Sequence, residues 1–513
     1  MTAAVFTDIY RKFTEVYQRT LVEEEDAPQI PEKVLRCVWN DQLFNTPHLQ
    51  STQGHAIEVV SSGHWNFGAG PDFKNAVIRI DGQIQEGDVE LHIYGCDWRA
   101  HGHSENNEYD DVILHVFLWQ DRRGSSGSRK DTPSQSRPHI VELELKKYLK
   151  DGLLKLNEEL DFDSYPLLNQ FNTGLCHGPL SRLSKSRLEE LLSNAGDARI
   201  QNKMDRFHDR IILNGYEQTF YEGVAEALGY PSNKYPFRDL AERVPFAELV
   251  RLVSKKGTPA EKALPLQAVL LGVSGLLGNR IPETSELEGE GLLYVQNVQK
   301  LWKKHKRRFV DQVMDDPTAW KFGGMRPANF PYRRIAALAH LVVKHSGSGL
   351  FQDFVSFVNT MVSISQAKGY NERTGKKATQ YFFLEEDDFW SRHYTVDGKK
   401  LQGNQKLIGP DRARDIFINI AVPICLIYAR ASRSQPLEAF LHRGFSTQSS
   451  LADNQWLRFM KRYILGEKQR MLDILKSDRH TQGLMQVYQD FCTKNNNNCL
   501  RCRFPEVVDK YFS

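Results

Sequence analysis

The sequence predicts an α+β protein, in which a small domain built on a mixed β-sheet is followed by a larger, mainly α-helical region. Short runs rich in β-branched residues, bounded by turn residues, fill the first third of the chain and are typical of strands. Helical periodicity replaces them from about residue 153 onward. With 40% hydrophobic and 26% charged residues, the composition is that of a folded globular protein rather than a disordered or fibrous one.

The elements are expected in a simple order along the chain. A helix is predicted over residues 1 to about 28, and a second helical segment over 31–44 precedes the strands. The strands are expected at 56–60, 76–80, 89–93, 112–118 and 140–145. Asp81 and Gly82 form a two-residue turn signal, so the second and third of these strands are predicted to form a hairpin. The polar stretch 124–138 is expected to be an exposed insert because it offers nothing to bury.

Length, apolar runs and net charge limit the number of domains, the location of the protein and the kind of nucleic-acid surface it can have. A chain of 513 residues is too long for one core, and we divide it into an N-terminal helical segment (1–29), the sheet domain (30–150) and the helical region (151–513). Apolar runs such as 263–277 and 416–428 are too short to span a bilayer, and the first residues lack a secretion signal, so no membrane association and a cytoplasmic location are expected. Because the net charge is only +3, any nucleic-acid surface must be local.

A candidate acidic site lies in the sheet domain. Alternate residues share one face of a strand, so Asp88, Glu90 and His92 are expected to project together. Asp72 follows a Gly-Pro turn, and the hairpin is expected to bring it beside Glu90. Carboxylate oxygens suit Mg²⁺ or Mn²⁺, which can orient a phosphodiester and activate water. The alternative is a solvated polar strand face, with Asp72 as a turn residue.

The order of a helix, a hairpin, Pro-Asp and Glu-x-His resembles the PD-(D/E)XK, or restriction-endonuclease-like, nuclease superfamily. The resemblance implies a nuclease-like domain with Asp72 and Glu90 at the two acidic positions, and catalysis by Asp72, Asp88, Glu90 and His92. His92 stands where that superfamily usually has lysine, so it is expected to act as a ligand or as a general base. His101 and His103 are expected to support the site or to bind metal themselves; the alternative is that they cap a turn.

The chain also resembles a bacterial family of unknown function. The matching stretches include Gly-Pro-Asp-Phe at 70–73, Gly-Asp-Val-Glu-Leu-His at 87–92, Val-Ile-Leu-His-Val at 112–116, Arg-Pro-Ala-Asn-Phe-Pro at 326–331, and the C-terminal cysteine cluster. This resemblance implies no particular activity.

Two basic segments are candidates for nucleic-acid binding, because Lys and Arg interleaved with aromatic residues can follow a phosphate backbone. The residues concerned are Lys303, Lys304, Arg307, Arg308, Arg326, Arg333 and Arg334. The alternatives are a solvated helix face for the first segment and an ordinary interdomain joint for the second.

A metal site is expected at the C-terminus. Cys492, Cys499 and Cys502 have the spacing Cys-x₆-Cys-x₂-Cys, which is typical of thiolate ligands to zinc, and Cys176 is the candidate fourth ligand, with His177 as the alternative. Some RecB-like nucleases carry a comparable four-cysteine iron–sulfur site, so the resemblance implies either Zn²⁺ or an iron–sulfur cluster. Reduced thiols without metal are the alternative.

The sequence therefore predicts a divalent-metal-dependent nuclease that hydrolyses phosphodiester bonds in DNA or RNA. Two other functions fit the same residues. One is a catalytically silent nucleic-acid-binding or assembly protein that keeps the nuclease-like fold. The other is a zinc-dependent hydrolase built on His92, His101 and His103. Nucleic acid is the expected partner, and the sequence does not indicate a protein partner.

Overall fold

A computed structural model gives the structure of the chain, and it describes residues 32–45, 48–66, 70–120, 137, 139–149, 174–279, 281, 284–314, 319–322, 325–370, 372–386, 388–447, 455–466, 468–492, 499 and 502–512. The helix predicted over 1–28 and nearly all of the insert at 124–138 lie outside the described residues. The domain boundary predicted at residue 150 adjoins an undescribed stretch and stays a prediction. The chain forms two compact units, one of Met1–Ala198, Ala452–Leu475 and His480–Ser513, and one of Arg199–Leu451 and Lys476–Arg479.

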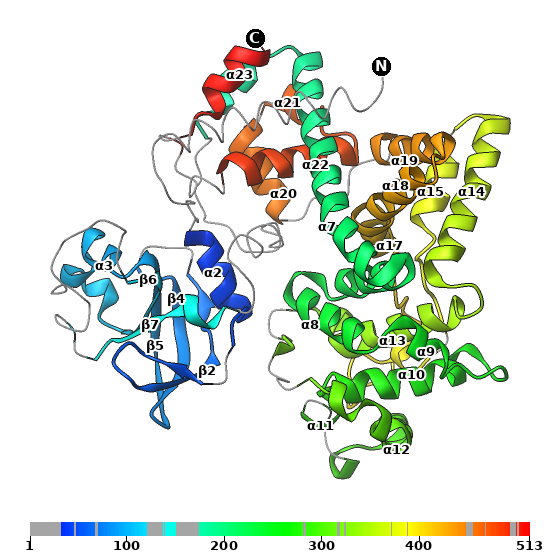
Figure 1. Ribbon diagram of the computed structural model, residues 1–513, viewed down its shortest axis with the longest axis horizontal. Coiled ribbons are helices and arrows are strands. Elements are labelled where there is room, and N and C mark those ends of the chain that lie inside the picture. Colours follow the sequence, from blue (N-terminus) through cyan, green and yellow to red (C-terminus); the bar gives the residue numbers. More distant parts are fainter. Residues whose placement is uncertain are drawn as a thin grey trace. The chain divides into compact units, whose positions relative to one another are not determined.

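The fold class is α+β, as predicted, with a mixed sheet followed by a largely helical region (Figure 1). Within the described residues, one sheet contains β1 Leu49–Gln50, β2 Ala56–Ser61, β3 His64–Trp65, β4 Phe73–Ile80, β5 Gln83–Tyr94, β6 Val112–Trp119 and β7 Val141–Glu144. The strand order is β1-β2-β4-β5-β6-β7, and β3 pairs with β4. The sheet is antiparallel from β1 to β5, whereas β6 and β7 run parallel to β5.

The β4–β5 hairpin is confirmed, and its turn has a local cause. Asp81 and Gly82 both have positive φ angles, of 48° and 84°, as a two-residue turn between twisted strands requires. The hairpin pairs Phe73 at the start of β4 with Val89 on β5. This register places the residue before β4, Asp72, next to the central part of β5.

Several helical segments accompany the sheet. They are α2 Glu32–Asp41, α3 Asp97–Ala100, and the 3₁₀ turns η1 His103–Glu105, η2 Asn107–Tyr109 and η3 Leu145–Tyr148. Helix α2 packs against β5 and buries Val34, Leu35 and Val38 completely, because these residues lie three to four positions apart on one helix face. The connection from β5 to β6 contains α3, η1 and η2, because parallel neighbouring strands need a crossover connection and cannot be joined by a tight turn.

The first unit also holds a helical lobe. Its segments are α6 His177–Arg182, the first part of α7 Lys185–Leu228, α20 Gln455–Met460, η10 Lys461–Leu465, α21 Gln469–Leu472, α22 Asp478–Val487, η11 Tyr488–Cys492 and α23 Phe504–Phe512. They enclose a core of their own, which includes Leu191, Leu465 and Phe491.

The second unit is built from helices around the largest core of the described chain. They are the rest of α7, α8 Tyr230–Arg243, α9 Phe246–Val250, α10 Pro259–Val273, α11 Leu276–Asn279, α12 Gly289–Phe309, α13 Pro331–Lys344, α14 Leu350–Lys368, α15 Glu372–Thr379, α16 Phe389–Arg392, α17 Pro410–Ile416, η9 Phe417–Ala421, α18 Val422–Ala431 and α19 Gln435–Thr447. Gly272 on α10 lies against the indole of Trp302 on α12, where a Cβ would come within 2.2 Å of the ring. The glycine is thus explained by close helix packing. Among the described helices, none is both long and apolar enough to cross a membrane.

Candidate metal centre

The middle of β5 carries a run of buried polar residues. Glu90 and His92 project from the same face of the strand because side chains alternate. The solvated strand face that was the alternative is not found, since Glu90 is 4% exposed and His92 is 1% exposed. The physical reason is that the connection after β5 folds over this face, with the Trp98 ring packed edge-on to His92. The polar residues therefore form an interior cluster.

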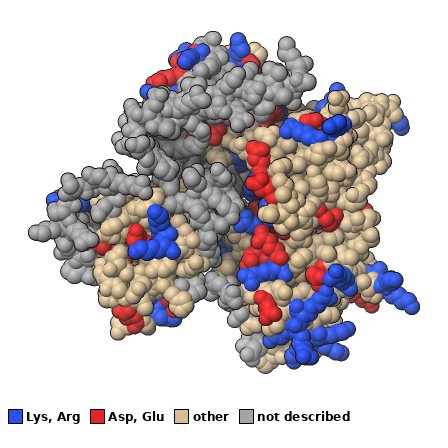
Figure 2. Space-filling view, in the orientation of Figure 1, with Lys and Arg blue, Asp and Glu red and all other residues tan. Residues whose placement is uncertain are grey.

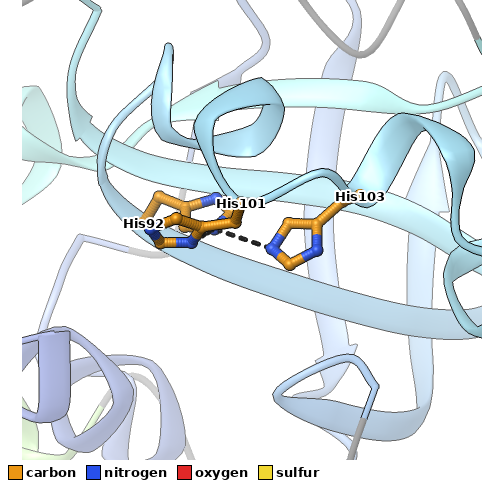
Figure 3. Close-up of side chains that lie close together, drawn as sticks. All are labelled: His92, His101 and His103. Atoms are coloured by element: carbon orange, nitrogen blue, oxygen red, sulfur yellow. Dashed lines mark hydrogen bonds between the residues drawn. The ribbon is translucent and has the colours of Figure 1, made fainter.

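Three imidazole rings meet in this cluster. His92 Nε2 lies 3.1 Å from His101 Nδ1 and 3.2 Å from His103 Nε2, and Figure 3 shows His103 pointing toward His92. One potential ligand atom from each ring lies within 4.8 Å of the others. Each imidazole nitrogen offers either one N–H or one lone pair, so His92 Nε2 can make only one good hydrogen bond to its two nitrogen neighbours. A cation between the three nitrogens would satisfy all of them.

The second nitrogen of His92 is held by another histidine. Its Nδ1 lies 2.9 Å from Nε2 of His115 on β6, while the buried Nδ1 of His115 has no hydrogen-bond partner among the described residues. If His92 Nδ1 donates to His115, the Nε2 lone pair of His92 points to the other two rings. A hydrogen bond to the far nitrogen is the usual way in which a metal-binding histidine is oriented. His115 thus contacts the His92 ring from the neighbouring strand, inside the core.

Burial sets the protonation of the cluster. It lowers the pKa of His115 to about 3, and it lowers the pKa of His92 and of His103 as well. His92, His103 and His115 are thus neutral at ordinary pH, which is the form of histidine that ligates metals. His101 is exposed, so the cluster reaches the protein surface at that ring.

The two expected carboxylates do lie together beside the histidines. Glu90 Oε2 accepts a hydrogen bond from the Asp72 backbone N–H at 2.9 Å, and Glu90 Oε1 lies 3.3 Å from His103 Nε2 and 3.5 Å from His92 Nε2. Burial raises the pKa of Glu90 to about 8, because the lowering effect of the Arg36 charge is smaller. Glu90 is therefore the carboxylate that faces the imidazole cluster.

Asp72 makes its ion pair and its hydrogen bond with groups outside the histidine cluster. Its Oδ1 pairs with the Arg36 guanidinium on α2 at 2.6 Å, and its Oδ2 accepts a hydrogen bond from the Leu91 backbone N–H at 3.2 Å. Burial nevertheless raises the pKa of Asp72 well above its ordinary value. Both oxygens of Asp72 therefore already have a polar partner.

Asp88 is engaged with the neighbouring strand. It accepts hydrogen bonds from Lys74 Nζ at 2.6 Å and from the Asn75 backbone N–H at 3.1 Å. These contacts tie the start of β4 to β5. A supporting role for Asp88 in the site stays a prediction.

Some neighbours of the cluster are not singled out by the sequence reasoning. Arg36 and Glu32 lie on one face of α2, 3.8 Å apart, and the Tyr109 ring stacks on His103 with 4.0 Å between ring centres. The available signal was the spacing of Glu32 and Arg36, since residues four apart share a helix face. That signal is common on solvated helices, so it does not by itself point to a site.

The four cysteines expected to bind metal line one pocket in the helical lobe of the first unit. No disulfide joins them. The pKa of Cys176 is raised to about 12, chiefly by burial and further by Cys502 and Cys499. The alternative ligand, His177, does not line this pocket.

The basic residues have two different environments, both in the second unit. Lys303, Lys304, Arg307 and Arg308 are exposed on α12, where Figure 2 shows Lys and Arg gathered. Arg326 is exposed as well. In contrast, Arg333 and Arg334 are buried, and their guanidinium groups donate to backbone carbonyls of Trp390 and Leu407, among others. These two arginines hold the helical core together, which leaves them unavailable to a phosphate backbone in this structure.

The fold and the cluster define an α+β protein with a histidine triad, two of whose rings are buried, that could bind a metal ion. Residues 32–447 match the family described as "Protein of unknown function (DUF2851)", and the chain belongs to that family. The match ends before the C-terminal cysteines, which we expected to share in the resemblance. No curated protein and no solved structure matches the chain.

Proposed function

We propose that the protein is a metal-dependent hydrolase whose metal ion is bound by His92, His101 and His103. The observation that carries this proposal is the convergence of one nitrogen from each ring, all within 4.8 Å of one another. Three histidines that leave a position for water are typical of catalytic zinc sites. The exposed ring of His101 marks the side from which water and substrate can reach such a position.

The donor set favours zinc over the Mg²⁺ or Mn²⁺ expected from the carboxylates. Imidazole nitrogens suit Zn²⁺ and similar transition metals, whereas Mg²⁺ prefers oxygen ligands. Asp72, one of the two expected oxygen ligands, is already paired with Arg36 at 2.6 Å. The structure therefore supports the histidine cluster as the metal site more strongly than the pair of Asp72 and Glu90.

We assign Glu90 as the general base. A bound zinc ion lowers the pKa of its water and neutralises negative charge on the leaving oxygen. Glu90 Oε1 lies 3.3 Å and 3.5 Å from two of the ligand nitrogens, and its other oxygen accepts a hydrogen bond from the Asp72 N–H. Burial raises the pKa of Glu90 to about 8, and the charge of a bound cation would favour its ionised form. Glu90 would then take a proton from the water that attacks the phosphorus and would return that proton to the leaving oxygen as the ester bond breaks.

Phosphodiesters are the proposed substrates. The order of Pro-Asp and Glu-x-His in the sheet domain supports this choice through its resemblance to metal-dependent nucleases, and the exposed basic residues on α12 offer a surface for nucleic acid. The main competing function is a silent nucleic-acid-binding protein. This silent function is favoured by the burial of His92 and Glu90, because burial restricts the approach of a polymer to the proposed metal ion.

The test combines metal binding with hydrolysis. The metal-free full chain is titrated with Zn²⁺ and assayed on bis(p-nitrophenyl) phosphate and on single- and double-stranded DNA and RNA. His103→Ala should weaken zinc binding at this site by at least about tenfold and abolish hydrolysis, whereas His64→Ala, which removes an exposed histidine of the same sheet, should change neither. Nucleic-acid binding without zinc-dependent hydrolysis by the wild type would support the silent protein instead.

Two further variants separate the alternatives for the site. Glu90→Gln should keep the zinc and slow hydrolysis by about 10²- to 10⁴-fold, as removal of a general base does. His92→Lys should abolish both zinc binding and hydrolysis. A His92→Lys protein that cleaves nucleic acid with Mg²⁺ or Mn²⁺ would instead assign the chemistry to Asp72 and Glu90.

A further inference from the structure

Four cysteines that are distant in sequence meet in the helical lobe of the first unit. Cys176 directly precedes α6, Cys492 ends η11, and Cys499 and Cys502 precede α23. All four line the same pocket. The inference drawn from this cluster does not depend on the proposed hydrolase activity.

Two of the cysteine sulfurs lie beside Gly174. A Cβ placed on Gly174 would lie 3.4 Å from Cys176 Sγ and 3.4 Å from Cys499 Sγ, so these two sulfurs flank the glycine. Tyr463 also reaches the cluster, with its hydroxyl 2.9 Å from Cys499 Sγ. A hydroxyl that can donate to a sulfur is a contact that stabilises thiolate character.

The rest of the pocket wall is apolar. It is formed by Leu175, Ile464, Val487, Phe491, Phe504 and Pro505. A single buried cysteine in such a setting is ordinary, because cysteine packs like a small hydrophobic residue. Four of them on one wall are not required for packing, and four thiolates are the ligand set of structural zinc sites and of iron–sulfur clusters.

The spacing of the sulfurs favours the larger of these two occupants. A single zinc ion with bonds of 2.3 Å needs sulfurs about 3.8 Å apart. Among the residues that the structure describes, the histidines form a group of three ligand atoms within 4.8 Å, and the four cysteines do not. A cluster of several iron and sulfide ions is larger than one ion, and its ligands stand further apart.

We propose that Cys176, Cys492, Cys499 and Cys502 bind an iron–sulfur cluster that fastens the C-terminal segment to α6. The link joins parts of the lobe whose contacts include the apolar packing of Phe504 and Val508 and an exposed ion pair between Arg182 and Asp509. Exposed ion pairs contribute little to stability, so the cluster would reinforce the apolar packing that holds α23.

The test uses the full chain, purified without oxygen. Wild-type protein should contain iron and acid-labile sulfide, absorb broadly near about 400 nm and give an electron paramagnetic resonance signal in one redox state, as thiolate-bound clusters do. Cys499→Ser should lose most of the iron and sulfide. Cys425→Ala is the control, because Cys425 is also a free cysteine but lies in α18 of the second unit, outside this pocket; it should keep the full iron content.

A measurement on the wild type keeps the proposal testable even if Cys499→Ser does not fold. Removal of iron by a chelator should speed the proteolysis of α23 and leave α18 protected. Wild-type protein that contains zinc and no iron, or neither metal, would overturn the proposal. A Cys499→Ser protein with the same iron content as the wild type would do so as well.

Discussion

Arg36→Ala tests whether the ion pair under the histidine cluster holds the sheet domain together. The variant removes the cation from Asp72, whose carboxylate side chain is 5% exposed and 2.6 Å from the guanidinium. Removing one partner of a buried pair typically costs about 3–5 kcal/mol, because the other charge is left uncompensated. Burial already raises the pKa of Asp72, so this carboxyl can take up a proton, and we expect a loss near the lower limit, about 3 kcal/mol.

The same sheet supplies a matched control. Arg79 on β4 pairs with Glu58 on β2, and both side chains are more than a third exposed. Arg79→Ala should therefore change the free energy of unfolding by no more than about 1 kcal/mol. Because the chain has two units, native-state hydrogen exchange of peptides from β4 and β5, in the presence of a chelator, is the suitable assay.

A second variant separates charge from packing. Adding Asp72→Asn to Arg36→Ala removes the unpaired carboxylate, and it should recover part of the lost protection. Equal effects of Arg36→Ala and Arg79→Ala on exchange would refute the reasoning, since the buried pair would then contribute no more than the exposed one.

Two other substitutions test the packing and the site. Gly272→Ala should destabilise the second unit by about 1–3 kcal/mol, since its Cβ would overlap the Trp302 ring, whereas Gly403→Ala, with open space around it, should stay within about 0.5 kcal/mol in thermal unfolding. Equal melting temperatures of the two variants would contradict this packing. His115→Ala should weaken zinc binding by about 10- to 100-fold without removing a ligand, measured by calorimetric titration beside His64→Ala. An unchanged affinity would show that His115 does not position His92.

Much of the sheet domain could be predicted from the sequence because its signals are local. Strand alternation placed Glu90 and His92 on one face, and the Asp-Gly turn fixed the β4–β5 register that brings Asp72 to Glu90. The burial of this face, in contrast, has a non-local cause. Whether a polar strand face is solvated depends on what packs over it, and the periodicity of β5 contains no information on the later segment that carries His101 and His103.

The partners of the site residues were harder to predict than the residues themselves. The pairing of Arg36 with Asp72 and the contact of His92 with His115 depend on tertiary packing between elements. The basic residues illustrate the same limit, since Arg333 belongs to a sequence that suits a surface but lies in the core. The spacing of Cys499 and Cys502, in contrast, is a local signal. It predicted a cluster of cysteines, and the four cysteines do line one pocket.

The central claim is that His92, His101 and His103 bind a catalytic metal ion. The most direct measurement is the zinc content and zinc-dependent phosphodiester hydrolysis of the wild type, compared with those of His103→Ala and of the control His64→Ala. The account predicts that His103→Ala loses one equivalent of zinc and all hydrolysis, while His64→Ala keeps both. Wild-type protein and His103→Ala with the same zinc content and the same hydrolysis rate would contradict it.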